Sequence, residues 1–257
     1  MKQLEVIEKP IVLDESTFIE AEKVIFRREG SITTNGWELR IRAKHIELES
    51  NAPGGSQPTI LSFADRSMRA GEDGSDAGNI YIIADKVTGS ALIIKNGGED
   101  GAKGSKGNKG KTGNSGRNAR GRHHMDLRGC VGRRATRGGR GGTGGHGGTG
   151  GAGGDGGDVV YFIRDGAENI KVETVSAGRP GAGGDGGDGG DGGPGGKSSN
   201  GTGGCGGMSG ASRGPKGQTG QVGNDGNEGE DGSIHDLLSL GATEISGEIN
   251  DLKSSAS

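Results

Sequence analysis

The stretch GGTGGHGGTGGAGGDGGD, residues 141–158, is two-thirds glycine, and its glycines are regularly spaced. Glycine loses more conformational freedom on folding than any other residue, so a run of this kind stays a flexible linker unless contacts outside the run order it. Glycine occupies every third position from Gly138 to Gly156. This period indicates a regular conformation in which one face of the chain is glycine.

The same period recurs in four tracts, which are residues 98–118, 138–158, 178–198 and 214–232. Counted in whole triplets, the first three tracts have 21 residues each and the fourth has 19. A free linker needs no fixed length, so the nearly equal lengths indicate that the tracts are matched to one another.

Three structures are compatible with glycine at every third position. A collagen triple helix also needs many prolines, and the chain has six. A flexible spacer leaves the equal lengths unexplained. The third structure is a bundle of polyproline-II or polyglycine-II helices within one chain, in which glycine lets neighbouring backbones approach and exchange amide hydrogen bonds. The sequence favours this third interpretation.

Two of the tracts carry glycine on two faces, because two of every three positions are glycine through most of residues 138–158 and 178–198. We expect these two to be interior and the one-glycine tracts to be peripheral. The glycines expected to pack against neighbouring backbones are Gly141, Gly144, Gly147, Gly150, Gly184, Gly187 and Gly190.

The rest of the chain predicts short strands. Residues 1–68 contain KVIF, SITT, WELRIRAKHIELES and TILSF, and the polar break inside ELRIRAKHIEL predicts a strand, a corner and a second strand. The expected fold class is all-β plus polyproline/polyglycine-II, with β-solenoid or β-sandwich elements alternating with a bundle of period-three glycine helices. The expected parts are residues 1–68, 69–232 and 233–257, the last as a short helix or strand with a tail.

An internal repeat supports this alternation. GNIYIIADKVTGSALIIKNGGEDG begins at Gly78 and GDVVYFIRDGAENIKVETVSAGRPG begins at Gly157. Each is a pair of apolar strands around a polar corner, followed by a glycine tract. Only 27% of the residues are hydrophobic, so we expect no large conventional core.

Charge is distributed unevenly, although the net charge is only -3. Residues 103–140 hold 12 lysines or arginines and one acid, whereas acidic residues recur from Asp155 onward. Opposite strips on neighbouring tracts would attract one another and set their register. The RGGRGG sequence at Arg137 resembles arginine-glycine segments of RNA-binding proteins, but the strip lacks aromatic side chains for base stacking, so protein partners are favoured over nucleic acid.

Histidine and cysteine residues are candidate metal ligands, because imidazole and thiolate bind zinc or copper. His123, His124, Cys130 and His146 are weak candidates because their spacing fits no structural zinc pattern, and we predict no metal and no cofactor. Cys130 and Cys205 can pair, but the N-terminal sequence has no signal-peptide pattern, and thiols in such chains are more often reduced. No run is long enough to span a bilayer, and the compartment stays open between cytoplasm, virion and exported assembly.

The glycine tracts resemble the glycine-rich, collagen-like repeat proteins of bacteria and phages, and the polyglycine-II bundles of snow flea antifreeze protein and of phage tail-fibre tip adhesins. The strand repeats NIYIIADKVTG and LRIRAKHIEL are similar to β-solenoid rungs of bacterial surface adhesins. The resemblance to tail-fibre adhesins implies receptor binding by a loop, here residues 117–137. Its candidate contacts are Arg117, Arg120, Arg122, His123, His124, Arg128, Arg133 and Arg134.

The expected function is that of a non-catalytic structural or adhesive protein, used as a spacer or display platform in a surface, fibre or phage-tail assembly. The sequence contains no phosphate-binding lysine loop and no nucleophile elbow, so we predict no enzyme activity. Expected partners are proteins, further copies of the chain or a cell-surface receptor. Two alternatives are nucleic-acid binding through residues 103–140 and ice binding, although the charged Lys103, Lys106 and Lys109 would interrupt a flat ice-binding face.

Overall fold

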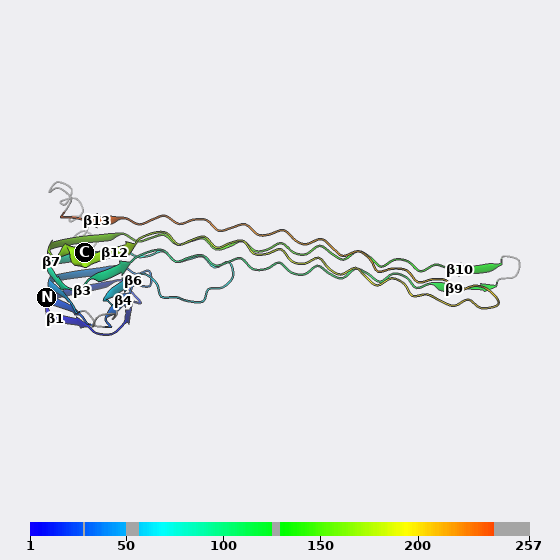
Figure 1. The fold of residues 1–257 in the computed structure, drawn as a ribbon, viewed down its shortest axis with the longest axis horizontal. Coiled ribbons are helices and arrows are strands. Elements are labelled where there is room, and N and C mark those ends of the chain that lie inside the picture. The colour runs from blue at the N-terminus through cyan, green and yellow to red at the C-terminus, as the bar shows by residue number, and fades with distance from the viewer. Residues whose placement is uncertain (28, 50–56, 125–128, 239–257) are drawn as a thin grey trace. The chain divides into compact units, whose positions relative to one another are not determined.

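The computed structural model describes the chain in four stretches, which are residues 1–27, 29–49, 57–124 and 129–238 (Figure 1). The chain divides into two compact units. Unit 1 consists of Met1–Ala102, Ala152–Gly181 and Asn227–Ser257, and unit 2 consists of Lys103–Gly151 and Ala182–Gly226. Each glycine tract contributes residues to both units, and the part boundaries expected at residues 68 and 232 stay a prediction.

Unit 1 is built from two parallel sheets. The six-stranded sheet has the order β1 (Lys2–Ile7), β3 (Thr17–Phe26), β5 (Leu39–Leu48), β7 (Ile80–Gly89), β11 (Val159–Asp165) and β13 (Ile234–Asp236). The five-stranded sheet has the order β12 (Ile170–Thr174), β8 (Leu92–Lys95), β6 (Thr59–Leu61), β4 (Ser31–Thr33) and β2 (Ile11–Val12). Successive strands alternate between the sheets from β1 to β8, so each pair of strands adds one layer.

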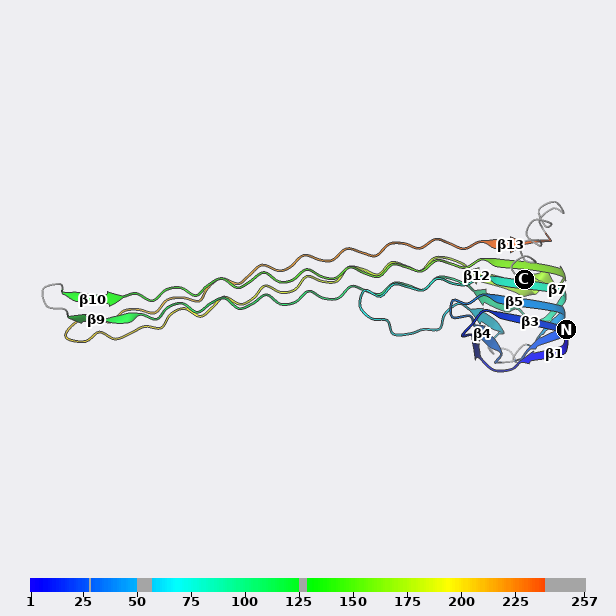
Figure 2. The same cartoon turned by 180° about the vertical axis from the view of Figure 1, so that it is seen from behind.

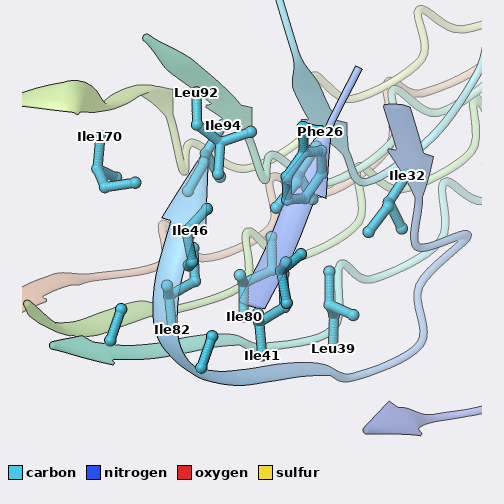
Figure 3. Packing of buried hydrophobic residues seen from close by; sticks show 14 of the residues in the cluster. Phe26, Ile32, Leu39, Ile41, Ile46, Ile80, Ile82, Leu92, Ile94 and Ile170 are labelled. Carbon is cyan, nitrogen blue, oxygen red and sulfur yellow. The ribbon is translucent and has the colours of Figure 1, made fainter. Parts of the chain in front are cut away.

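The hydrophobic core of unit 1 lies between the two sheets (Figure 3). Phe26, Leu39 and Ile82 come from the six-stranded sheet, and Ile32 and Leu92 come from the five-stranded sheet, and all are essentially inaccessible to solvent. Alternation along a strand sends every second side chain inward, so a few strands rich in isoleucine and leucine fill the space. The chain thus concentrates its scarce hydrophobic residues in one unit.

Strand β5 differs from the predicted strand, corner and strand. It pairs with β3 and β7 from Leu39 to Leu48, and the register is the same on either side of Lys44. Its inward face changes phase instead, because Ala43 and Ile46 are both buried, with exposed Lys44 and half-buried His45 between them. The polar break therefore marks two consecutive outward residues inside one strand.

The two copies of the internal repeat lie in adjacent layers. Val159 of β11 pairs with Ile80 of β7, and Ile170 of β12 pairs with Leu92 of β8. A 3-10 turn, Ala167–Asn169, precedes β12. Two glycine tracts, residues 98–118 and 138–158, therefore lie between these two layers in the sequence, although the layers are adjacent in space.

A segment before β7 uses side chains to bind a facing backbone in unit 1. Asp73, Asp76 and Asn79 are spaced three residues apart, and their side-chain oxygens accept amide hydrogen bonds at 2.7, 2.8 and 2.9 Å from Ala152, Asp155 and Asp158. Without these side-chain acceptors, the three backbone amides would be unpaired. Gly74 donates its own amide to the carbonyl of Ala152 at 2.8 Å. The period-three arrangement thus begins before the first glycine tract.

Unit 2 contains a two-stranded antiparallel sheet, β9 (Arg120–His124) and β10 (Cys130–Arg133), together with long extended segments (Figure 2). The segments are joined by backbone hydrogen bonds. Gly144 donates to Gln218 at 2.9 Å, and Gly145 donates to Asn108 at 2.7 Å and accepts from Gly187 at 2.8 Å. The segment containing residues 138–151 is therefore bonded to each of the other three.

The predicted fold class, with its bundle of period-three glycine helices, is wrong. The regular elements of the described residues are three sheets of six, five and two strands, nearly all parallel, and one 3-10 turn. The glycine tracts contain no helix in the described chain. Their amides donate to other segments rather than along their own chain, so these tracts are extended and the fold is one of largely parallel β-sheets.

No helix in the part of the chain that the structure describes has the length and apolar character needed to cross a membrane.

Candidate functional site

The strongest concentration of unpaired charge in unit 2 surrounds the β9–β10 hairpin. We call residues 115–124, 129–137 and 194–213 the basic hairpin region. Its described sequence holds no acidic residue and no phenylalanine, tyrosine or tryptophan. Its eight lysines and arginines make no ion pair among the described residues, and they are Arg117, Arg120, Arg122, Arg133, Arg134, Arg137, Lys197 and Arg213.

The predicted receptor-binding residues occupy three kinds of position. Arg120, Arg122, His123 and His124 belong to β9, and Arg133 belongs to β10, which Arg134 follows directly. Arg117 lies in the extended segment that leads into β9. Arg128 lies outside the described residues, and so do the side chains of the two histidines.

A hollow of about 700 Å³ brings some of these residues together within unit 2. Its lining includes Arg117, Arg120, Arg133 and Lys197, all of which are exposed. The cations therefore come from three separate segments of the chain. The structure does not place Arg122 or Arg134 in this lining.

Backbone hydrogen bonds fix the segments that border the hollow. The amide of Ala119 donates to the carbonyl of Lys197 at 2.9 Å, and the amide of Lys197 donates to Oδ1 of Asn118 at 2.9 Å. The amide of Arg117 donates to Oγ1 of Thr136 at 2.8 Å, and the amide of Thr136 donates back to the carbonyl of Arg117 at 2.9 Å. The charged side chains thus extend from a backbone whose position is defined.

A disulfide between Cys130 and Cys205 also holds the hairpin. Their Cα atoms are 5.7 Å apart and 75 residues apart in sequence. On the other side of the hairpin, the amide of Thr202 donates to the carbonyl of Arg122 at 2.9 Å. Because disulfides persist in oxidising surroundings, this bond indicates that unit 2 is suited to such a compartment.

The weak metal candidates do not form a cluster. Cys130 is bonded to Cys205, so its sulfur is not a free thiolate, and His146 is exposed on a glycine segment. Within the stretches that the structure describes, no group of three or more histidine, cysteine, aspartate or glutamate side chains is placed to hold a metal ion.

The expected packing glycines lie against backbone atoms of other segments. A Cβ atom added at Gly141, Gly144 or Gly147 would overlap the carbonyl oxygen of a glycine in residues 184–190. A Cβ atom added at Gly184, Gly187 or Gly190 would overlap a carbonyl oxygen in residues 105–111. The amide of Gly150 donates to the carbonyl of Asn224 at 2.9 Å.

An ion-pair ladder joins two segments of unit 2, as the charge pattern predicts. The ladder consists of Lys103 with Asp185 at 3.2 Å, Lys106 with Asp188 at 3.8 Å and Lys109 with Asp191 at 2.8 Å. The hydrogen bond between the last two groups raises the pKa of the Lys109 ammonium group and lowers the pKa of the Asp191 carboxyl group. The ladder neutralises this stretch, whereas the basic hairpin region keeps its charge.

Sequence reasoning did not identify Lys197 as part of the candidate site. It lies 79 residues from Asn118, near the end of the third glycine tract, in GGKSSN. The signal in the sequence is the position of Lys197 in its tract. Successive tracts of equal length that run in opposite directions bring the end of the third tract to the same level as the end of the first. The tract lengths therefore place Lys197 at the same level as Arg117, and the structure shows that the two segments are adjacent.

Comparison of the chain with protein-family profiles, curated proteins and solved structures gives no match.

Proposed function

We propose that the chain is a non-catalytic adhesive protein in which unit 2 displays a recognition surface, the basic hairpin region, to a receptor. The observation that carries this proposal is the disulfide between Cys130 and Cys205, which pins a basic hairpin, whose described arginines are exposed and make no ion pair, to a facing segment. Structural scaffolds usually neutralise their charges, as the Lys109–Asp191 pair does. A surface that keeps charge on an ordered backbone is suited to binding.

The glycine segments support this role because they order a hairpin without a hydrophobic core. Gly116 donates its amide to the carbonyl of Pro194 at 2.8 Å, and Gly196 donates to that of Thr136 at 3.0 Å. Such bonds restrain the hairpin before any ligand arrives, and less conformational entropy is then lost on binding. The resemblance of the glycine triplets to the glycine-rich repeat proteins of bacteria and phages is part of this proposal.

We assign the assembly role to unit 1. Its first strands, β1 and β2, are edge strands of the two sheets. They expose Leu4, Ile11 and Val12, of which Val12 is 64% exposed. An unpaired sheet edge with apolar side chains accepts another strand readily, so protein partners or further copies of the chain fit this surface.

The adhesive function is tested with the full chain, fluorescently labelled, on a panel of intact bacterial and animal cells. One variant replaces residues 117–137 by a glycine-serine chain of equal length, which removes every arginine of the hairpin, and carries Cys205→Ser. A control variant carries only Cys130→Ser and Cys205→Ser, which removes the disulfide but keeps the hairpin sequence. We expect the parent to be retained on at least one surface, the control to be retained more weakly, and the replacement variant to fall to background.

Two results would refute the proposal. One is full retention of the replacement variant, which would place recognition outside the hairpin. The other is background retention of the parent on every surface tested.

A further inference from the structure

We propose that the hollow beside the β9–β10 hairpin is a binding site for the phosphate groups of a phosphorylated surface glycan. This inference rests on the proposed adhesive function and names its ligand class. The hollow gathers Arg117, Arg120, Arg133 and Lys197 from three segments of unit 2. No described acidic side chain lies in the basic hairpin region to neutralise them.

The pairing of the hairpin strands itself points to an anion. Arg120 of β9 and Arg133 of β10 are directly opposite each other in the antiparallel register. Like charges in this arrangement repel and weaken a sheet, so the pair is unfavourable in the free protein. A phosphate between the two guanidinium groups would turn that repulsion into two attractive contacts.

The register is irregular where this pair forms. It shifts between Val131 and Arg133, which is the signature of a β-bulge or a similar irregularity. Bulges redirect side chains and often lie beside functional sites. Arg120 and Arg133 form the pair next to this shift, and both residues line the hollow.

Backbone hydrogen bonds fix the positions of the main chain at Arg117 and Lys197, the third and fourth cations of the hollow. The amides of Arg117 and Lys197 donate to Thr136 Oγ1 and Asn118 Oδ1, respectively. Guanidinium groups bind phosphate through paired hydrogen bonds, and a lysine adds a point charge. Three arginines and one lysine around one hollow therefore fit a doubly charged oxyanion better than a single carboxylate.

Two observations favour a glycan over a nucleic acid as the source of the phosphate. Single-stranded nucleic acid is bound largely by stacking of bases on aromatic rings, and the basic hairpin region has no phenylalanine, tyrosine or tryptophan. The disulfide between Cys130 and Cys205 fits an oxidising environment outside the cell, where phosphorylated surface polysaccharides are exposed. Ser115, also in the lining, adds a hydroxyl of the kind that bonds to sugars.

The test measures binding of the full oxidised chain to immobilised dextran phosphate, with unmodified dextran as the uncharged reference. The site variant is Arg120→Gln with Arg133→Gln. The control variant is Lys111→Gln with Lys216→Gln, which removes the same charge from exposed residues of unit 2 outside the hollow. Hydrogen exchange of the hairpin amides verifies that each variant keeps the fold.

We expect the parent to bind dextran phosphate and not dextran, and the site variant to bind about tenfold or more weakly, because contacts to charged groups are lost. The control should stay within about twofold, as surface charges distant from a contact contribute little. The slope of log affinity against log salt should fall by about 1 for each arginine that contacts a phosphate.

Several outcomes would overturn the inference. Equal losses in the site and control variants would mean diffuse attraction by net charge, and unchanged binding of the site variant would remove the hollow from recognition. Tighter binding of the parent to a short DNA duplex would make nucleic acid the ligand. Binding to phosphatidylglycerol vesicles without binding to dextran phosphate would make a lipid headgroup the source.

The adhesive function and this ligand assignment can fail separately. If the hairpin is needed for cell retention but dextran phosphate is not bound, the ligand class is wrong and the function stands. If dextran phosphate is bound through Arg120 and Arg133 but the replacement variant is retained on cells, the site exists and the adhesive role is wrong.

Discussion

Gly147→Ala adds one methyl group at a point where two backbones of unit 2 meet. The new Cβ would overlap the carbonyl oxygen of Gly184 and lie 2.9 Å from the amide nitrogen of Gly223. All of these neighbours are backbone atoms, so no side-chain rotation relieves the contact. The segments must move apart, and the hydrogen bonds that join them are strained or lost.

The size of the effect follows from those hydrogen bonds. Gly147 donates to Gln221 at 2.9 Å, Gly184 donates to Gly148 at 2.8 Å, and Gly223 donates to Gly184 at 2.9 Å. Three bonds with net values of about 0.5–1.5 kcal/mol each give a loss of about 1.5–4.5 kcal/mol. Alanine also restricts the unfolded chain, which offsets about 0.4–1 kcal/mol of that loss.

A matched control is Gly206→Ala, in the same unit. A Cβ added there has no atom within 4 Å, and the backbone lies outside the left-handed region, so we expect unchanged or slightly higher stability. Thr149→Val, on an exposed side chain of the same segment as Gly147, should also be nearly silent. The two controls separate the overlap from the general effects of substitution.

The assay is amide hydrogen exchange read by mass spectrometry, because it reports opening of each segment separately. We expect Gly147→Ala to lower the opening free energy of residues 141–151 and 182–190, with unit 1 unchanged. If Gly147→Ala and Gly206→Ala both exchange like the parent, close backbone contact at the glycines does not order these segments, and the reasoning is refuted.

Two further predictions concern acid and reduction. Hydrogen bonds from Arg66 lower the pKa of the Glu99 carboxyl group below its ordinary value of 4.5. The pair therefore stabilises unit 1 above pH 4.5, and this contribution disappears as the pH falls through the depressed pKa. Proteolysis of the 62–78 loop should therefore increase on acidification below pH 4.5, and Arg66→Gln should flatten that pH dependence; a parallel profile would contradict it. Reducing the bond between Cys130 and Cys205, which closes 75 residues, should destabilise the hairpin by about 4.5 kcal/mol in the loop-entropy description, seen as faster exchange in β9 and β10 with β7 unaffected. Equal exchange before and after reduction would show that the hairpin does not depend on the crosslink.

The sequence pattern was informative wherever a period fixes what one face of a chain must be. Glycine at every third position predicted close approach at Gly147, and the charged third positions predicted that Lys109 would meet an acid. Alternating isoleucine and leucine predicted inward faces in the strands. The same pattern misjudged the fold class, because a period of three does not distinguish a bundle of helices from extended segments attached to parallel sheets.

The composition of the candidate site needed the tertiary structure. The sequence placed Arg120 and Arg133 in one basic loop, but it did not reveal that they face each other, nor that Cys130 pairs with Cys205. Lys197 was missed because it is 79 residues from Asn118, which binds its amide.

What the sequence by itself determined is therefore local: which positions tolerate no side chain, which face inward and which carry charge. Which segments are neighbours was decided only by the tertiary structure. A residue's place in a repeat fixes its face on its own segment, whereas contact across segments depends on where the chain turns and in what register it returns. The hollow lined by Arg117, Arg120, Arg133 and Lys197 forms where both strands of the β9–β10 hairpin meet the end of the third glycine tract.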